Sequence, residues 1–169
     1  MARMLSAGRT KVSLLTTAPV DPGAPTATEL NAGIDISDFV PRSNFSWTAT
    51  DPATENDSPI SAEFDAEVPV AKTYELRLGL YRIFLPAGGF DATNEAAFEA
   101  VKEMGSTVWV YARRMDKLSD EAWAATDEVY LGGEVTSGGA KSVDGGYQKY
   151  EINFYPVDMY DFVEAAAAA

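Results

Sequence analysis

Several stretches of this chain alternate apolar and polar residues one by one. In "FSWTAT", for example, an aromatic or alanine side chain comes before each Ser or Thr. Because successive side chains of a β-strand point to opposite faces of a sheet, this period of two predicts half-buried strands. Other stretches rich in aromatic and β-branched residues are separated by glycine pairs, which favour turns. The expected strands cover residues 45–50, 60–70, 73–86, 107–114, 128–136 and 147–157.

One segment, "DATNEAAFEAVKEMG", has the period of a helix instead. Thr93 or Asn94 provides an N-cap, and Gly105 suits the left-handed position after the last turn. We expect a helix at about residues 94–104 that covers an open end of the core with a narrow apolar stripe. The stripe consists of Ala97, Phe98, Val101 and Met104.

The order of these elements is several strands, one helix and several more strands. This order predicts a mainly β (α+β) fold, a β-sandwich or barrel of antiparallel strands with one flanking α-helix, and not alternating βαβ units. At 169 residues the chain is long enough for one domain. We expect an extended N-terminal assembly arm at 1–33, because its prolines and glycines oppose regular structure. The body then covers 34–163, and an alanine-rich tail covers 164–169.

The composition removes most catalytic chemistry. The chain has no histidine and no cysteine, which excludes Ser-His-Asp catalysis and metal sites with histidine or thiolate ligands. Only carboxylate, lysine and tyrosine chemistry remain for catalysis. Because so few options are left, we predict that the protein is not an enzyme and uses no cofactor. Its 26 acids against 13 bases give a net charge of −13. This charge argues against binding to nucleic acid or to an anionic membrane, because such binding relies on Lys and Arg.

The charges are unevenly distributed along the chain. Residues 1–20 hold three bases and no acid, whereas residues 43–71 hold six acids and no base. A basic arm and an acidic belt on one chain could attract each other between copies. An ordinary solvated acidic surface with a basic terminus explains the same pattern. The candidate contacts of the arm or between copies are Arg3, Arg9, Lys11, Asp51, Glu55 and Asp57.

Two short segments invite comparison with ligand-binding loops. "GGEVTSGGAKS" lacks the glycines of a phosphate-binding loop, since Ala140 and Val135 occupy their positions. The acids of "DPATENDSP" do not have the spacing of a calcium-binding EF-hand loop. We therefore expect a hairpin loop and a surface loop, and no metal.

A row of acids in the stretch 60–70 is more specific. If this stretch is a strand, Glu63, Asp65 and Glu67 share one face, and the opposite face, with Phe64, Ala66 and Val68, packs in the core. Two such carboxylates could act as a hydrolase pair, but nothing raises the pKa of one above the other. A solvated surface and a repellent lining are the remaining interpretations.

The chain resembles the siphophage tail tube (major tail) proteins. The resemblance rests on "PTATELNAGIDISDFVP" at the end of the arm, the strand pair around the loop 51–59, the mid-chain helix and the late aromatic strand "GYQKYEINFYPVD". It covers most of the chain in order and spacing. No additional immunoglobulin-like domain is expected, and "EAAAAA" at the C-terminus matches no feature of the family.

The resemblance implies a structural virion protein, made in the host cytoplasm, that self-assembles into hexameric rings. These rings stack into the tail tube through which the genome is delivered, and sheets of neighbouring subunits form a continuous β-barrel around the lumen. It also implies contacts with the tape measure protein and with tail terminator and baseplate proteins. DNA would pass without specific binding, and no membrane is involved. In this setting Glu63, Asp65 and Glu67 are expected to face the lumen.

Three other interpretations remain open from the sequence alone. The first is a β-sandwich that binds a ligand such as carbohydrate through Trp47, Trp109, Trp123 and tyrosines. The second is the carboxylate-dependent hydrolase. The third is a related tail terminator or secretion-system tube protein, which shares the tube fold.

Overall fold

The computed structural model describes residues 7–56 and 67–167. This part of the chain contains seven β-strands, two short α-helices and one 3-10 helix. The helical elements are α1 (Ala27–Ala32), η1 (Arg42–Asn44) and α2 (Ala96–Val101). The strands are β1 (Thr10–Leu15), β2 (Ile34–Asp35), β3 (Phe45–Asn56), β4 (Glu67–Tyr81), β5 (Met104–Arg114), β6 (Glu128–Val143) and β7 (Lys149–Glu164).

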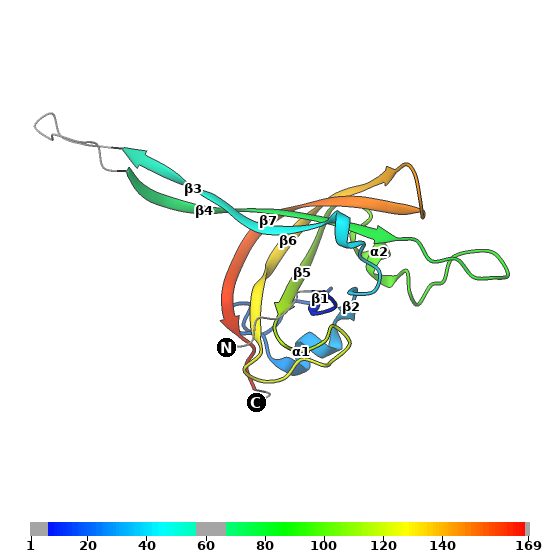
Figure 1. Cartoon of the computed structure of the whole chain (residues 1–169), viewed down its shortest axis with the longest axis horizontal. Helices are drawn as coiled ribbons and strands as arrows, with labels where there is room; N and C mark the ends of the chain where they lie inside the picture. The colour runs from blue at the N-terminus through cyan, green and yellow to red at the C-terminus, as the bar shows by residue number, and fades with distance from the viewer. Residues whose placement is uncertain (1–6, 57–66, 168–169) are drawn as a thin grey trace, which may run out of the picture.

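All seven strands belong to one antiparallel sheet with the order β2-β1-β5-β6-β7-β4-β3. The prediction of a mainly β, antiparallel fold is therefore confirmed, with two short helices where the sequence suggested one. Figure 1 shows the sheet curling, so that β3 and β4 run across the other strands. The Tyr130 hydroxyl on β6 donates to the Trp47 carbonyl on β3 at 3.2 Å, although these strands are not neighbours in the sheet. One curled sheet thus supplies both walls of the core.

The curl depends on irregular pairing between β6 and β7. Their register shifts between Glu134 and Val135 and again between Ser137 and Ala140, and such bulges bend a strand pair. Gly133, beside the first shift, has a φ of 147°, and a Cβ there would lie 2.0 Å from the Asp158 carbonyl oxygen. Only glycine fits this position. Beyond the bend, the first part of β7 pairs with β4 as well as with β6.

The main core lies inside the curl and contains side chains from every layer around it. The apolar side chains of the alternating strands point into this core, because removing apolar surface from water is favourable. The buried residues of this cluster are Val12, Leu14, Ile36, Trp47, Leu76, Leu78, Leu80, Ala97, Phe98, Val101, Val108, Val110, Ala112, Leu131, Val135, Ile152 and Phe154.

Helix α2 covers one end of this core, but it is shorter than the sequence suggested. The structure buries Ala97, Phe98 and Val101, and the Ser137 hydroxyl donates to the Val101 carbonyl at 2.6 Å. The expectation that Met104 completes the apolar stripe is wrong, because Met104 is the first residue of β5 and is 84% exposed. Strand pairing between Met104 and Gly138 ends the helical stretch early.

The start of the helical segment also differs from the prediction. The Asp91 carboxylate, and neither Thr93 nor Asn94, accepts backbone hydrogen bonds here, from the N–H groups of Thr93 at 3.1 Å and Asn94 at 3.4 Å. These bonds organise the turn that leads into α2, whose own N-cap, Glu95, makes no side-chain capping bond.

Residues 7–33 include β1 and α1 and are part of the folded body, so this part of the chain is not the extended arm expected at 1–33. Strand β1 lies between β2 and β5, and Leu14 is fully buried. Helix α1 begins with a capping box in which Thr26 and Glu29 bond each other's backbone N–H groups. Together with residues from β5, β6 and the loop after β5, this region forms a second core on the other face of the sheet. Its buried residues are Leu15, Leu30, Tyr111, Trp123, Val129 and Ala165.

The C-terminal residues are also attached to this second core. Strand β7 continues to Glu164, one residue beyond the expected boundary. Ala165 is buried, and its N–H donates to the Asp127 carbonyl at 2.8 Å. Ala166 exchanges backbone hydrogen bonds with Pro25 and Ala27. No helix in the described ranges is long and apolar enough to cross a membrane.

Candidate assembly surfaces

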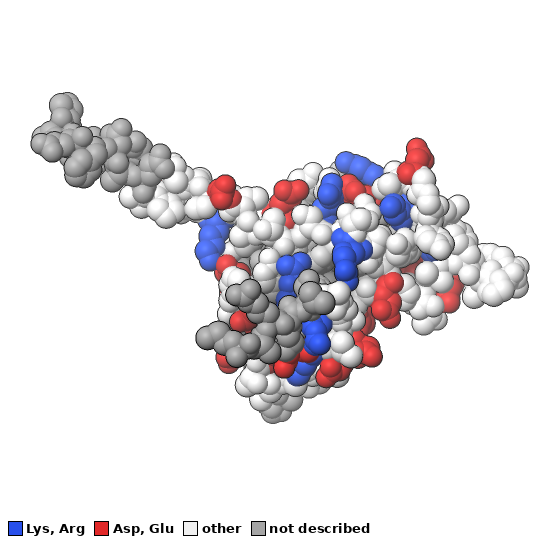
Figure 2. Space-filling model, viewed as in Figure 1, with Lys and Arg blue, Asp and Glu red and all other residues white. Residues whose placement is uncertain are grey.

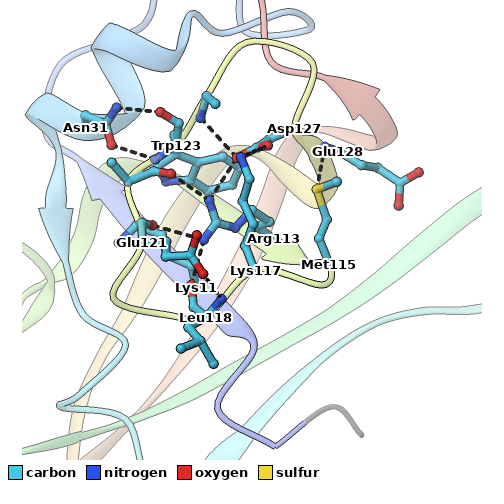
Figure 3. Close-up of polar contacts among 12 residues, drawn as sticks. Lys11, Asn31, Arg113, Met115, Lys117, Leu118, Glu121, Trp123, Asp127 and Glu128 are labelled. Carbon is cyan, nitrogen blue, oxygen red and sulfur yellow. Dashed lines mark hydrogen bonds and ion pairs between the residues drawn. The ribbon is translucent and has the colours of Figure 1, made fainter. Parts of the chain in front are cut away.

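The most deeply buried charges form a network that fixes the loop between β5 and β6 (Figure 3). The Arg113 guanidinium is 0% exposed and donates to the Asp127 carboxylate at 2.8 Å. It also donates to the carbonyl groups of Leu118, Glu121 and Ala122. The indole ring of Trp123 lies 5.3 Å from the same guanidinium.

Asp127 is the counter-charge of this network. Burial would raise the pKa of its carboxyl, but hydrogen bonds from Lys117, the Ala124 N–H and Arg113 together hold the pKa below its ordinary value. The carboxylate is thus committed to its own loop. The network holds the loop in place and presents no free acid or base to a substrate.

A second buried ion pair holds the loop that leads into α2. Arg82 donates to the Glu95 carboxylate at 2.6 Å, and the N–H of Ile83 donates to the same carboxylate at 2.7 Å. The guanidinium also lies over the rings of Phe90 and Phe98, at 4.1 and 4.0 Å from their centroids. Glu95 is itself buried, at 3% exposure. This pair connects the loop after β4 to the helix and the core.

The longest feature outside the body is a two-stranded ribbon formed by residues 49–56 of β3 and 67–73 of β4. Figure 1 shows it projecting from one end of the molecule. Val68 and Val70 lie on the β4 part of this ribbon and are 57% and 56% exposed. The expectation that Val68 packs in the core of its own chain is therefore wrong. The ribbon therefore exposes apolar side chains that the body of the same chain does not cover.

An exposed aromatic surface lies at the opposite end of the long axis (Figure 1). The loop after β4 presents Phe84, Leu85 and Phe90, with the two phenylalanine rings 5.1 Å apart. Tyr147, in the turn between β6 and β7, is 82% exposed and packs edge-on against Tyr81 at 6.0 Å. Both ends of the molecule therefore expose apolar side chains, but the two ends have different shapes.

Strand β7 has an open edge along its second half. Strand β4 pairs with it only as far as Phe154, and among the described strands residues 155–164 pair only with β6. Tyr155, Val157 and Phe162 are largely exposed in this part of the strand. Unpaired backbone groups beside exposed apolar side chains are a template for another strand.

The tryptophans do not form a platform for a sugar. Trp47 and Trp123 are buried in the two cores, and Trp109 is partly buried against the second one. The Trp123 indole N–H donates to the Ser13 hydroxyl at 2.8 Å. All three rings therefore serve the fold. In the described part of the chain, no group of three Asp or Glu residues is arranged to hold a metal ion.

The exposed ribbon, the aromatic end and the open strand edge are surfaces that suit association with other copies. A comparison with protein-family models matches residues 1–169 to the family described as phage tail tube protein. The chain belongs to this family. A comparison with curated proteins found no match. The protein is accordingly a structural component of the phage tail in the virion, and membership of the tail tube family implies self-association in the tail.

The structure places only some of the acidic and basic residues that the sequence singled out in this tail tube protein. Asp51 and Glu55 are exposed on the ribbon, and Arg9 is partly exposed at the start of β1. Lys11 is buried and bonded to Asp35 and to the Ser119 carbonyl, so its prediction as a contact between copies is wrong. Residues outside the described ranges are Arg3, Asp57, Glu63 and Asp65, and Glu67 is described only as the first residue of β4.

Sequence reasoning missed the aromatic end of this tail tube protein. The signal was available in "IFLPAGGFD", where Gly88 and Gly89 form a tight turn between Phe84 and Phe90. We interpreted the first part of that segment as the end of a strand, because a continuous apolar run does not tell which side chains lack a partner.

Proposed function

We propose that this chain forms hexameric rings that stack into the tail tube, the conduit through which the genome is delivered. The observation that carries the proposal is the ribbon, whose Val68 and Val70 side chains lie in water in a single copy. A two-stranded hairpin is at best marginally stable in water by itself. A second copy that covers Val68 and Val70 would supply the missing layer.

The two ends of the molecule support a head-to-tail arrangement. A contact between different surfaces on two copies closes into a ring or continues as a filament, depending on the rotation between copies. The ribbon and the aromatic end project in opposite directions along the long axis (Figure 1). In the proposed tube, one end of each copy meets the body of a copy in the next ring.

The open edge of β7 supports pairing between neighbours within a ring. Strand β3 is the last strand of the sheet, so its outer edge is also unpaired among the described strands. Pairing around a ring would join the sheets into a continuous barrel and remove edges that otherwise favour aggregation. This arrangement follows the family resemblance and uses edges that are present in the protomer.

For the lumen we propose that Glu63, Asp65 and Glu67 face the passing DNA. The support is chemical: the segment 43–71 has six acids and no base, and a channel that lets DNA slide should offer no cations to its phosphates. By family resemblance, the tape measure protein occupies the tube before ejection, and tail terminator and baseplate proteins close its ends.

The experiment is electron microscopy and sedimentation of the purified protein. Wild-type protein is expected to form six-fold rings and tubes. Val70→Asp should abolish the tubes and leave a folded protomer, because it places a charge on the apolar face of the ribbon. The matched control is Ala71→Asp at the exposed adjacent residue, which lacks a large apolar side chain and should still assemble. A wild-type protein that stays monomeric at high concentration would contradict the proposal, as would equal behaviour of the two variants.

A further inference from the structure

A cleft of about 430 Å³ lies between the start of β1, the loop before η1, the first residue of β3 and the end of β5. Arg42 and Arg114 line it, and Arg9 lies between two other lining residues, Gly8 and Thr10. The Arg114 guanidinium is placed over the Phe45 ring at 5.7 Å and over the Tyr130 ring at 4.5 Å. The cleft therefore presents two arginines and Asp38 beside the Phe45 ring, and Arg9 is next to it in the chain.

These arginines are unusual in such an acidic chain. Of the 13 Lys and Arg residues, all except Arg3 lie in the described ranges, and seven of those form ion pairs. Arg9, Arg42 and Arg114 are three of the remaining five. Figure 2 shows basic side chains gathered with acids over the body of the molecule. Asp38 also lines the cleft, but no ion pair among the described residues joins it to Arg42 or Arg114. In a chain with twice as many acids as bases, two arginines of one cleft that form no ion pair indicate an anion from outside the protomer.

The ribbon carries anions of the required kind. Asp51 and Glu55 are exposed on β3, and no ion pair among the described residues includes either of them. Phe45, the first residue of the same strand, lines the cleft. Asp51 lies six residues further along the strand, which at 3.3 Å per residue is roughly 20 Å away, and Glu55 is further still. An extended strand therefore cannot bring these acids back to the cleft of its own chain.

We propose that the cleft lined by Arg42 and Arg114 receives the acidic ribbon of a second copy, with Asp51 and Glu55 as the anions. Guanidinium groups suit this role because they bind carboxylates with two parallel hydrogen bonds. The proposal rests on the self-assembly proposed above and assigns one of its contacts. Nucleic acid is the competing anion, and the net charge of −13 makes it the weaker candidate.

Charge reversal tests the pairing. One variant reverses the cleft (Arg42→Glu with Arg114→Glu), a second reverses the ribbon (Asp51→Lys with Glu55→Lys), and a third carries all four changes. Each of the first two should raise the critical concentration for assembly at least ~10-fold, because close charge pairs at interfaces couple strongly. The third should assemble nearly as the wild type does, since the signs match again. Lys141→Glu, an exposed base outside the cleft, is the control.

Each outcome bears on a different statement. Suppose that the wild type assembles. If assembly is not restored in the four-fold variant, or if the two reversed variants assemble normally, the cleft does not receive the ribbon, whereas the proposal that the chain forms a tube still stands. If the wild type does not assemble, the proposed function itself fails. Loss of binding to a short DNA duplex in the cleft-reversed variant, with normal assembly, would make the cleft a nucleic-acid site. Arg42→Glu alone, which keeps the stacked Arg114, repeats the test if the double variant unfolds.

Discussion

Replacing Asp127 by Asn should destabilise the protomer strongly, although no surface used for assembly changes. The substitution keeps the shape of the side chain and removes the negative charge that faces Arg113 and Lys117. Breaking a buried ion pair by neutralising one partner typically costs about 3–5 kcal/mol. Arg113 keeps its hydrogen bonds to three carbonyl groups, so we expect a loss near the lower value, about 3 kcal/mol.

The assay is urea unfolding followed by tryptophan fluorescence, since Trp123 lies against the Arg113 guanidinium. The control is Asp161→Asn, which neutralises the partner of an exposed lysine, Lys72, and should cost no more than about 1 kcal/mol. The slope of the transition with urea should not change in either variant. If Asp127→Asn costs no more than Asp161→Asn, the network does not fix the loop and the reasoning is refuted.

Three further predictions concern the protomer. The pKa values of Asp127 and Asp35 are lowered in the fold. The stability that these carboxylates contribute should therefore be constant above about pH 5 and be lost as the pH falls below ~4. Urea unfolding measured between pH 3 and 7 checks this. Phe98→Asp should cost at least ~3 kcal/mol and abolish soluble expression, whereas Glu99→Lys at the exposed neighbour should fold normally. Deleting residues 1–20 removes β1 and should unfold the chain, and a cooperative thermal transition in that truncation would show that β1 is dispensable.

The sequence predicted strands well where only one face is buried. In β3 the alternation of Trp47 with polar neighbours marks the core face, because the period of a strand is two. Strand β1 is different because it contributes side chains to a core on each face of the sheet. Its sequence, "KVSLL", is a short and mostly apolar run that is followed by prolines. Its residues were therefore assigned to an arm. The capping box of α1 was visible as Thr26 and Glu29 but was overlooked in the same context.

The candidate surfaces were harder to predict because they depend on contacts that are remote in sequence. Met104 has helical spacing from Val101, but pairing with Gly138 draws it into β5 instead. The arginine cleft joins residues from β5 and from segments around β1 and β3, which no local pattern connects. Alternation predicted that Val68 packs in a core, but it does not show whose core covers it, and the register shifts between β3 and β4 interrupt the alternation.

The most direct test of the account is a cryo-EM reconstruction of the particles that the purified wild-type chain forms. We predict six-fold rings stacked into a tube, in which the apolar face of each ribbon, with Val68 and Val70, is buried against another copy. The cleft with Arg42 and Arg114 should then hold Asp51 and Glu55 of a neighbour. A reconstruction in which the ribbons stand free in solvent, or a protein that remains a monomer at all concentrations, would contradict it.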